Sequence, residues 1–433
     1  MEKANLSPRA QHVIDQRRAY FYPCTAHFYK HPPVLTRGKM QYVYDDAGRR
    51  YTDLFAGVSV IACGHCNDAI TEAAVEQMRA LQHTCTIYLT EPNVRLAEKL
   101  ACVLPGGLRR SFFCNSGSEA NEGALLLARL HTGRSGFIAL EHSLHGRTYL
   151  TMSVTGLAMW RADPHLAREE ANVSFIPRPY DAELSGDEAA HRSIAALRQV
   201  LAERGREIAA MIVEPIQGNG GIVAPPRWYY REVKRLLEAH GVLLIADEVQ
   251  SGFGRTGKMF AIEHFDVVPD IIAMGKALGN GVPISSFSTT DEIAASFTKP
   301  SASTFGGNPV ASVTALAVLD YIERERLMER AEQLGELLLE RLRALRERYR
   351  EAICDVRGIG LMAGFELRGA SPQQAAERVD EVLERMKDRG FLLGKNGVNR
   401  NVVVFQPPLV IAEEDIEAAV AALDEVLAEV LCN

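Results

Sequence analysis

A carboxylate and an amine follow two short apolar runs in the second half of the sequence. The first run, residues 242–246 (VLLIA), ends on Asp247, and the second, residues 271–274 (IIAM), is followed after one glycine by Lys276. An apolar run bounded by polar residues is typical of a strand buried on both faces, as in parallel sheets. Ligands of open parallel sheets bind at the carboxyl ends of strands, so we expect Asp247 and Lys276 to share one cleft.

A lysine and a carboxylate in one cleft suggest a particular chemistry. Burial disfavours the charged amine and lowers a lysine pKa, which favours the neutral, nucleophilic form. A neutral lysine beside an ionised carboxylate is typical of Schiff-base chemistry with pyridoxal phosphate.

The glycine string between the two residues offers an alternative. Residues 252–257 (GFGRTG) match the pattern of a dinucleotide-binding turn, as in nicotinamide oxidoreductases. The string begins five residues after Asp247 rather than in the turn itself, and no long helix is predicted after it. We therefore treat this alternative as the weaker one.

The composition is that of a globular protein. A chain of 433 residues exceeds one ordinary core, so two domains are expected. With 47% hydrophobic residues, 24% charged residues and a net charge of -7, neither nucleic acid nor a membrane is a favoured partner. The opening MEKANLSPRAQH has no signal-peptide core, and no apolar run nears the roughly 18 residues of a membrane span. We expect a cytoplasmic enzyme.

The eight cysteines are scattered, and only residues 63–66 (CGHC) resemble a motif. This motif could be a redox pair or half of a zinc site. No second Cys/His pair follows at zinc spacing, and no thioredoxin-like pattern surrounds it. We expect no metal, and a tight Gly-His turn flanked by two small buried thiols.

Strand patterns separated by helical or loop segments predict a mainly parallel sheet covered by helices. They lie at residues 112–114, 137–140, 209–214, 242–247, 270–274 and 284–289. Helices are predicted at residues 68–82 and 91–104, and one long charged helix at 315–351.

A smaller α+β unit follows, with paired strands at 353–367, a helix at 371–389, a strand at 401–405 and a last helix at 413–430. The N-terminal part holds a hairpin (QYVY, a turn, RRYTDL) that lacks partners of its own. We therefore divide the chain into an N-terminal segment at 1–65 that packs with the small domain, a large cofactor-binding domain at 66–320 and a C-terminal small domain at 321–433.

Residues 115–119 (NSGSE) lie where a predicted strand gives way to a helix. Backbone N–H groups at a helix start, flanked by small residues, form a cradle for phosphate. An ordinary helix cap, with Ser118 before Glu119, is the alternative. The downstream Asp247 and Lys276 favour the phosphate cradle.

Together these and other segments resemble the class III, or omega, aminotransferases, which are fold-type I pyridoxal phosphate enzymes. The similar segments occur in the family's order and span most of the chain: GVSVIACGHC, FFCNSGSEANEGAL, HSLHGRT, VEPIQGNGGI, LLIADEVQSGFGRTG, PDIIAMGKALGNGVP, STFGGNPVA, VRGIGLMAGFE and QPPLVI. Three stretches are most similar to the alanine–glyoxylate and beta-amino-acid aminotransferase branch: HFYKHPPVLTRGKMQYVYD, LQHTCTIYLTEPNV and ALGNGVPIS.

The resemblance implies an α/β fold, with a mainly parallel seven-stranded sheet in the large domain and a smaller α+β domain. It implies an aminotransferase that moves an amino group from an amine, beta-amino acid or omega-amino acid to a small keto acid such as pyruvate or glyoxylate. A racemase, aminomutase or amino-alcohol-phosphate phospho-lyase of the same fold is the alternative. A cofactor-binding regulator would need a DNA-binding domain, and the N-terminal residues show no such pattern.

The resemblance also implies a role for each matching residue. Lys276 would form the Schiff base with pyridoxal 5'-phosphate and move the substrate proton, and Asp247 would keep the pyridine nitrogen protonated. Gln250 would bind the ring 3'-oxygen, and Val249 would cover one ring face. Thr304 would reach the phosphate of the neighbouring subunit, which implies a homodimer with shared active sites; a tetramer built from such dimers is the alternative. Further cofactor contacts would come from Ser116, Gly117, Ser118, Leu144 and His145.

Three positions depart from the family pattern. Leu144 replaces a residue that is usually aromatic, Asn219 replaces a frequent glutamate, and Val404 replaces a frequent arginine that binds substrate carboxylates. The glutamate and arginine often pair, so losing both avoids an unpaired buried charge. Arg400 could supply a displaced guanidinium, or it could be a solvated loop residue. We hypothesise that the usual arginine does not bind alpha-carboxylates here.

Phe21, Tyr22 and Val58 lie in N-terminal segments that line the substrate pocket in relatives. An aromatic, apolar pocket would favour bulky or uncharged amino donors. Simple packing of the N-terminal arm is the alternative, since aromatic residues are commonly core residues.

Overall fold

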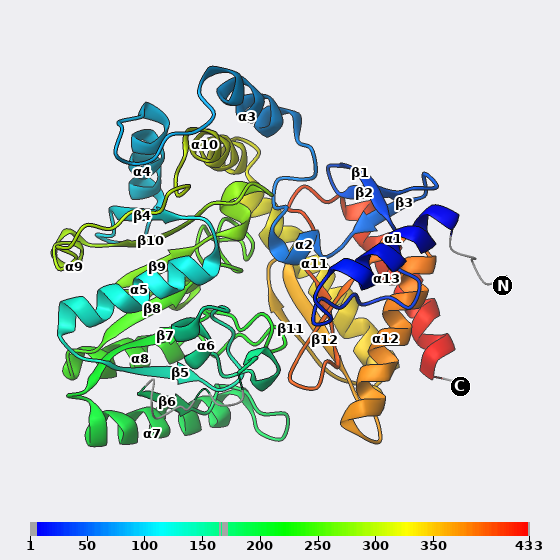
Figure 1. The fold of residues 1–433 in the computed structure, drawn as a ribbon. Coiled ribbons are helices and arrows are strands. Elements are labelled where there is room, and N and C mark those ends of the chain that lie inside the picture. The colour runs from blue at the N-terminus through cyan, green and yellow to red at the C-terminus, as the bar shows by residue number, and fades with distance from the viewer. Residues whose placement is uncertain (1–6, 164–165, 167–171, 432–433) are drawn as a thin grey trace.

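The structure is a computed structural model that describes residues 7–163, 166 and 172–431. Figure 1 shows a large sheet with helices around it and, beside it, a second group of strands and helices formed from the two ends of the chain.

A seven-stranded sheet with the order β4-β10-β9-β8-β7-β5-β6 forms the larger part of the molecule. The strands from β6 across to β9 pair in parallel, whereas β10 is antiparallel to both of its neighbours. The mainly parallel seven-stranded sheet predicted from the sequence is confirmed. The strands are β4 (Arg110–Cys114), β5 (Gly136–Leu140), β6 (Val173–Ile176), β7 (Ile208–Val213), β8 (Leu243–Asp247), β9 (Ile271–Met274) and β10 (Ser285–Thr289).

The sequence prediction missed only β6 among these strands. This strand is a short edge strand with two of its four residues half-buried, so it lacks the fully apolar run of the central strands. The central strands β7 and β9 are buried at every position, which is why their apolar runs were readable.

The helices around this sheet carry clear end signals. In α5 the side chain of Ser116 accepts a hydrogen bond from the N–H of Glu119, the Glu119 side chain reaches back to the cap, and Gly133 ends the helix in a left-handed conformation. The helices are α3 (Asp68–Ala80), α4 (Glu91–Val103), α5 (Gly117–Thr132), α6 (Tyr149–Ser153), α7 (Gly186–Arg204), α8 (Tyr229–Ala239), α9 (Asp291–Ala294) and α10 (Pro309–Arg324), with short turns η1 (Ala158–Trp160), η2 (Ala261–Phe265) and η3 (Lys276–Gly279).

Two four-stranded sheets form the smaller part, with the orders β1-β2-β3-β13 and β11-β12-β15-β14. Strand β3 pairs in parallel with β13, so the N-terminal hairpin joins a strand from near the end of the chain. The domain boundaries at residues 65 and 320 stay a prediction. The elements are α1 (Pro8–Tyr20), β1 (Leu35–Lys39), β2 (Tyr42–Asp45), β3 (Arg50–Asp53), α2 (Ala56–Ser59), α11 (Leu327–Arg348), β11 (Ile353–Ile359), β12 (Met362–Leu367), α12 (Pro372–Asp388), β13 (Phe391–Leu392), β14 (Gly394–Asn396), β15 (Val402–Phe405) and α13 (Glu413–Leu431).

The prediction of a single long helix at 315–351 is wrong. The chain forms α10 and α11 instead, separated at Arg326, which has a positive φ of 51°. The sequence does not reveal this break, because charged residues precede and follow Arg326 and the amphipathic pattern of a helix continues across it.

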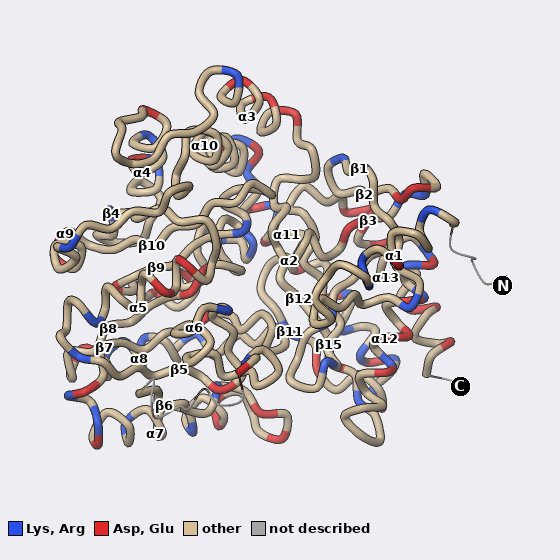
Figure 2. Tube along the Cα trace, viewed as in Figure 1, with Lys and Arg blue, Asp and Glu red and all other residues tan. Residues whose placement is uncertain are grey.

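Acidic and basic residues are interleaved along the peripheral helices, such as α7, α12 and α13 (Figure 2). Among the described residues, no helix is both long and apolar enough to span a membrane.

Candidate active site

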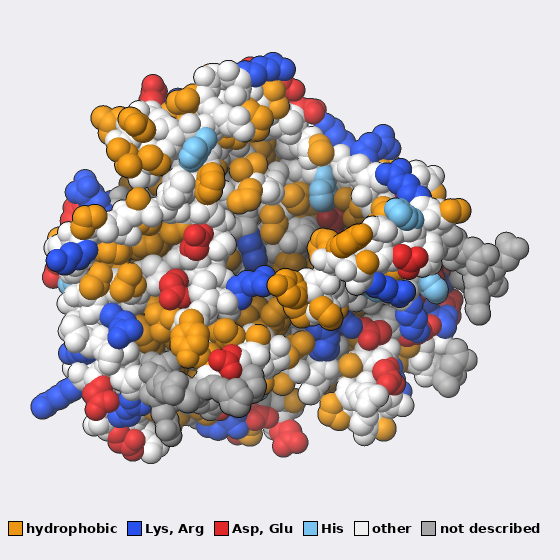
Figure 3. All heavy atoms as spheres, in the orientation of Figure 1, with side chains coloured by type: hydrophobic (Ala, Val, Ile, Leu, Met, Phe, Trp, Pro, Cys, Tyr) orange, Lys and Arg blue, Asp and Glu red, His pale blue; other side chains and the backbone are white. Residues whose placement is uncertain are grey.

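The carboxyl ends of β8 and β9 open onto a cavity of about 220 Å³ that Asp247 and Lys276 both line. Figure 3 shows this side of the molecule hollowed near its centre. The shared cleft expected from the two apolar runs is therefore present. Further predicted residues on the cavity wall are Ser116, Gly117, Ser118, Leu144, His145, Asn219, Val249 and Gln250.

Lys276 directly follows β9 and its short glycine link. Its φ of 45° is uncommon for a residue with a side chain, and such conformations cluster at functional sites. Burial lowers the pKa of the Lys276 amine, while the negative charges of Asp247 and Glu214 act in the opposite direction. Burial dominates, which favours the neutral amine.

Asp247 is held by three donors from different elements. Its Oδ2 accepts hydrogen bonds from Asn121 Nδ2 at 2.7 Å and from His145 Nδ1 at 2.8 Å, and its Oδ1 accepts one from the Val249 N–H at 3.1 Å. Asn121 also donates to the backbone oxygen of His145 at 2.7 Å. The carboxylate orientation is therefore fixed before any ligand arrives.

Glu214 is a buried carboxyl on the same cavity that the sequence interpretation missed. Its two oxygens accept hydrogen bonds from the N–H groups of Leu144 at 2.8 Å and Gly218 at 3.0 Å. Burial raises the pKa of Glu214 to about 7, against the charge of His145 and these hydrogen bonds, which lower it. The signal was available, since Glu214 directly follows a wholly apolar strand, as Asp247 ends one.

The start of α5 provides a cradle for an anion. The first N–H groups of a helix have no partner within it, and small residues flank them here. A Cβ on Gly117 would lie 2.6 Å from a Val249 methyl, so only glycine fits against that side chain. The hydroxyl of Ser118 accepts a hydrogen bond from the Arg147 N–H at 3.1 Å, and Ser285 holds the backbone oxygen of Ser116 at 2.8 Å.

The donor set fits a phosphorylated pyridine ring. The α5 cradle faces the same cavity as Asp247 and Lys276. Two polar atoms at that cavity, Nε2 of His145 and Oδ1 of Asn121, are buried without a hydrogen-bond partner among the described residues. Pyridoxal phosphate bound there would supply an electron sink for a carbanion at the substrate carbon.

The segment 218–221, of which Asn219 lines the cavity, is held by hydrogen bonds from other parts of the chain. Its four consecutive carbonyls accept hydrogen bonds from four other groups: Asn396 Nδ2 at 3.1 Å, the Gly397 N–H at 3.0 Å, Arg178 Nη1 at 2.7 Å and Arg357 Nε at 2.7 Å. Asn219 therefore presents its side chain to the cavity from a fixed backbone.

Val404 does not line this cavity. Its side chain is fully buried in an apolar cluster with Ile216, Ile222, Met362 and Val402. Side chains alternate along β15, so the even-numbered valines share that cluster. The structure thus separates Val404 from the candidate site.

Arg400 lies on the turn that adjoins the cavity wall. Its N–H donates to Gly397, whose own N–H donates to the carbonyl of Asn219. The Arg400 guanidinium lies 5.7 Å from the ring centre of Phe28 and has no carboxylate within ion-pair distance among the described residues. It does not line the cavity itself.

The other predicted residues lie outside the cavity lining. Thr304 is exposed beside Phe305, and Phe21 and Tyr22 are exposed at the end of α1. Val58 is half-buried, with a positive φ of 67°.

The dinucleotide alternative fails on local geometry. The glycine string is followed by η2, a short turn of five residues, and not by a helix that could receive a pyrophosphate.

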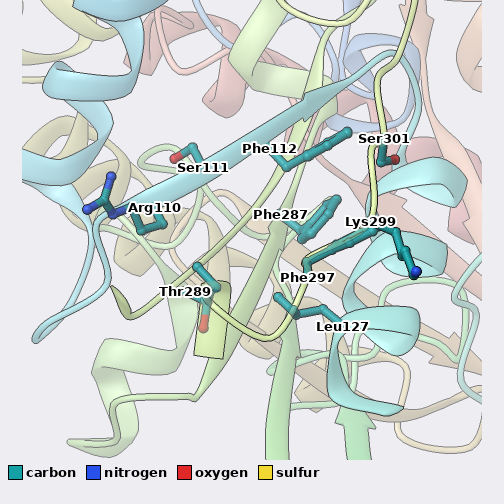
Figure 4. Close-up of a pocket in the computed structure, with 10 residues that line it drawn as sticks. Arg110, Ser111, Phe112, Leu127, Phe287, Thr289, Phe297, Lys299 and Ser301 are labelled. Carbon is teal, nitrogen blue, oxygen red and sulfur yellow. The ribbon is translucent and has the colours of Figure 1, made fainter. Parts of the chain in front are cut away.

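A second cavity of about 210 Å³ lies at the edge of the large sheet (Figure 4). Three phenylalanine rings, Phe112, Phe287 and Phe297, form its floor, and Arg110 on its rim already pairs with Asp291. It shares no residue with the candidate site.

Comparisons with known proteins agree with this geometry. The sequence profile of the family described as "Aminotransferase class-III" matches residues 25–427. An Arabidopsis thaliana protein named alanine–glyoxylate aminotransferase 2 homolog 2, mitochondrial, is 40% identical over 96% of the chain and 87% of the relative. An (S)-enantioselective omega-transaminase from Thermomicrobium roseum superposes with a TM-score of 0.89 at 30% identity, over 98% of this chain and 99% of that one. A phospholyase from Arthrobacter in complex with phosphoethanolamine gives 0.88 at 33% identity, over 96% and 99%. The chain belongs to the class III aminotransferases, a family of pyridoxal-phosphate-dependent transferases.

Proposed function

We propose that this enzyme moves an amino group from an amine, beta-amino acid or omega-amino acid to a small keto acid such as pyruvate or glyoxylate. The observation that carries the donor class is the lack of charge at two positions where the family resemblance leads us to expect a charged pair. Asn219 lines the cavity at the position of the expected glutamate, and Val404 is buried in an apolar cluster at the position of the expected arginine. Neither charge of the usual pair for an alpha-carboxylate is present.

In this proposal Lys276 removes and returns the proton at the substrate carbon, because it lines the cavity and burial lowers the pKa of its amine, which favours the neutral form. Asp247 keeps the pyridine nitrogen protonated, with its carboxylate oriented by Asn121 and His145. Gln250 contacts the ring oxygen, and Val249 and Leu144 cover the ring.

The phosphate is proposed to sit at the start of α5, against Ser116, Gly117 and Ser118. Thr304 is proposed to complete the phosphate site of a neighbouring subunit, which its exposure permits. This makes a homodimer the active unit. The cytoplasmic location also stays a prediction, and the name of the Arabidopsis relative places that protein in mitochondria.

Arg400 is proposed to bind a carboxylate that is distant from the amino group. It adjoins the Asn219 wall, is held over Phe28 and has no carboxylate partner among the described residues. Phe21, Tyr22 and Val58 are proposed to shape the outer pocket once the N-terminal arm and the second subunit are in place.

A donor panel tests the proposal. Initial rates are measured for alanine, beta-alanine, 4-aminobutyrate and an aromatic amine without a carboxylate, each against pyruvate, glyoxylate and 2-oxoglutarate, except that alanine is not paired with pyruvate, because that pair gives no net reaction. Omega-amino acids or amines with pyruvate or glyoxylate are expected to be the fastest pairs. Fastest turnover of alpha-amino acids with 2-oxoglutarate would contradict the proposal.

A phospho-lyase is the second candidate, supported by the 33% identical phospholyase structure. Phosphoethanolamine separates the two activities. A lyase releases inorganic phosphate from it without a keto acid, whereas the proposed enzyme does not.

A further inference from the structure

Gln406 is a buried polar residue that breaks an apolar run. It directly follows β15, whose four residues are all apolar and buried, and its own side chain is fully buried. Its backbone N–H donates to the carbonyl of Leu54 at 2.8 Å. An apolar residue could make the same backbone contact, so the amide needs a separate explanation.

The side chain of Gln406 makes one contact that concerns the site. Its Oε1 accepts a hydrogen bond from Nε2 of Gln250 at 3.3 Å. Its own Nε2 is buried without a hydrogen-bond partner among the described residues. A buried NH₂ group in this state destabilises the fold, so stability does not account for a glutamine here.

Gln250 lies between Gln406 and the cavity. It lines the cavity, whereas Gln406 lies behind it. Its Oε1 packs against Gly218 so closely that a Cβ on that glycine would overlap it, at 1.7 Å. The amide is therefore held at its oxygen end by packing and at its nitrogen end by Gln406.

We propose that Gln406 is a positioning residue that fixes the amide orientation of Gln250 toward the cofactor's ring oxygen. An amide nitrogen carries two hydrogens, and Gln406 uses one of them. The second N–H stays on the same end of Gln250 and is available to an anionic oxygen in the cavity. Without an acceptor behind it, Gln250 can turn its own oxygen toward that anion. The inference rests on the proposed contact between Gln250 and the ring oxygen.

The test uses the full-length protein loaded with pyridoxal phosphate and compares the variants Gln406→Leu and Gln406→Glu. The dissociation constant of the cofactor is measured by ultrafiltration. The absorbance of the bound cofactor is then followed during a pH titration, and the pH at half of the absorbance change is taken as the midpoint. Gln406→Leu is expected to weaken cofactor binding about fivefold and to raise the midpoint by about half a pH unit, because the ring oxygen loses a donor. Burial favours the protonated, neutral form of the carboxyl in Gln406→Glu, which keeps a carbonyl acceptor oxygen, so this variant is expected to restore both values.

Two further measurements separate positioning from folding. The melting temperature of Gln406→Leu is expected to stay constant or rise, because the unpartnered NH₂ is removed. In a Gln250→Leu background, the added Gln406→Leu change is expected to alter neither cofactor affinity nor midpoint. An equal loss of affinity in both backgrounds overturns the inference, as does unchanged affinity in the single variant. Failure of the unmodified protein to bind pyridoxal phosphate would instead overturn the proposed function.

Discussion

Nδ1 of His145 lies 2.8 Å from Oδ2 of Asp247, with both side chains buried. This hydrogen bond ties the loop after β5 to the end of β8 and leaves Nε2 of His145 without a partner among the described residues. The pair belongs to a wider network at the cavity floor, in which Asn121 holds the same carboxylate oxygen.

Replacing His145 by leucine removes a donor to a charged group. Hydrogen bonds to charged groups typically contribute about 1.5–3 kcal/mol, so kcat/KM is expected to fall about 10- to 100-fold. Steady-state kinetics at saturating cofactor measure the effect. The matched control is His191→Leu, since His191 is exposed on α7. Equal losses in both variants would show that the Asp247 contact is not the cause.

The raised pKa of Glu214 leads us to predict that the folding stability of the cofactor-free protein depends on pH. Its folded pKa of about 7 lies above its ordinary value of 4.5, so the folded state holds an extra proton between these values. The contribution to stability is greatest below pH 4.5 and is lost as the pH rises through 7, by about 3 kcal/mol at most.

Urea unfolding of the wild type and of Glu214→Gln between pH 4.5 and 7.5 measures this contribution. The glutamine variant is expected to lose less stability over that range. Glu292→Gln is the matched exposed control on α9 and is expected to follow the wild type. Parallel pH curves for Glu214→Gln and wild type would contradict the assignment.

Val404→Arg places a guanidinium among apolar side chains. An unpaired buried charge is costly, so the free energy of unfolding is expected to drop by about 3 kcal/mol or more. Val404→Leu, which keeps the site apolar, serves as the control. A stable Val404→Arg single variant would contradict the observed burial.

Arg400→Met tests the proposed distal carboxylate contact. We expect KM for omega-amino acid donors to rise tenfold or more, while KM for amines without a carboxylate stays constant, because only the omega-amino acids lose a charged partner. Arg206→Met, at an exposed position after α7, is the control. An equal rise of KM for both donor classes would contradict the carboxylate contact and would show that Arg400 acts only through packing.

The large sheet and the cleft could be predicted because buried parallel strands leave a plain signal. The apolar runs before Asp247 and Lys276 mark central strands, and parallel topology brings strand ends together. The same signal was present at Glu214, which ends the predicted strand at 209–214, but it was not used.

Other features depend on tertiary contacts that no local pattern encodes. The family resemblance predicts Val404 at a substrate-binding position, but strand alternation directs its side chain into an apolar cluster. The break at Arg326 is hidden by charges on both sides. Helix α1 was missed because only Ala10 and Ile14 are buried along it, which leaves no apolar stripe.

The central claim is tested most directly by mixing the loaded enzyme with an amine donor and no keto acid. The account predicts that the absorbance of the aldehyde form of the cofactor converts to that of the amine form, with one equivalent of carbonyl product per site. Lys276→Ala should abolish this conversion, lowering its rate by about 10³-fold or more, whereas Lys258→Ala, at an exposed position, should retain it. An unchanged cofactor absorbance in the wild type, with racemised donor or released phosphate, would contradict the account.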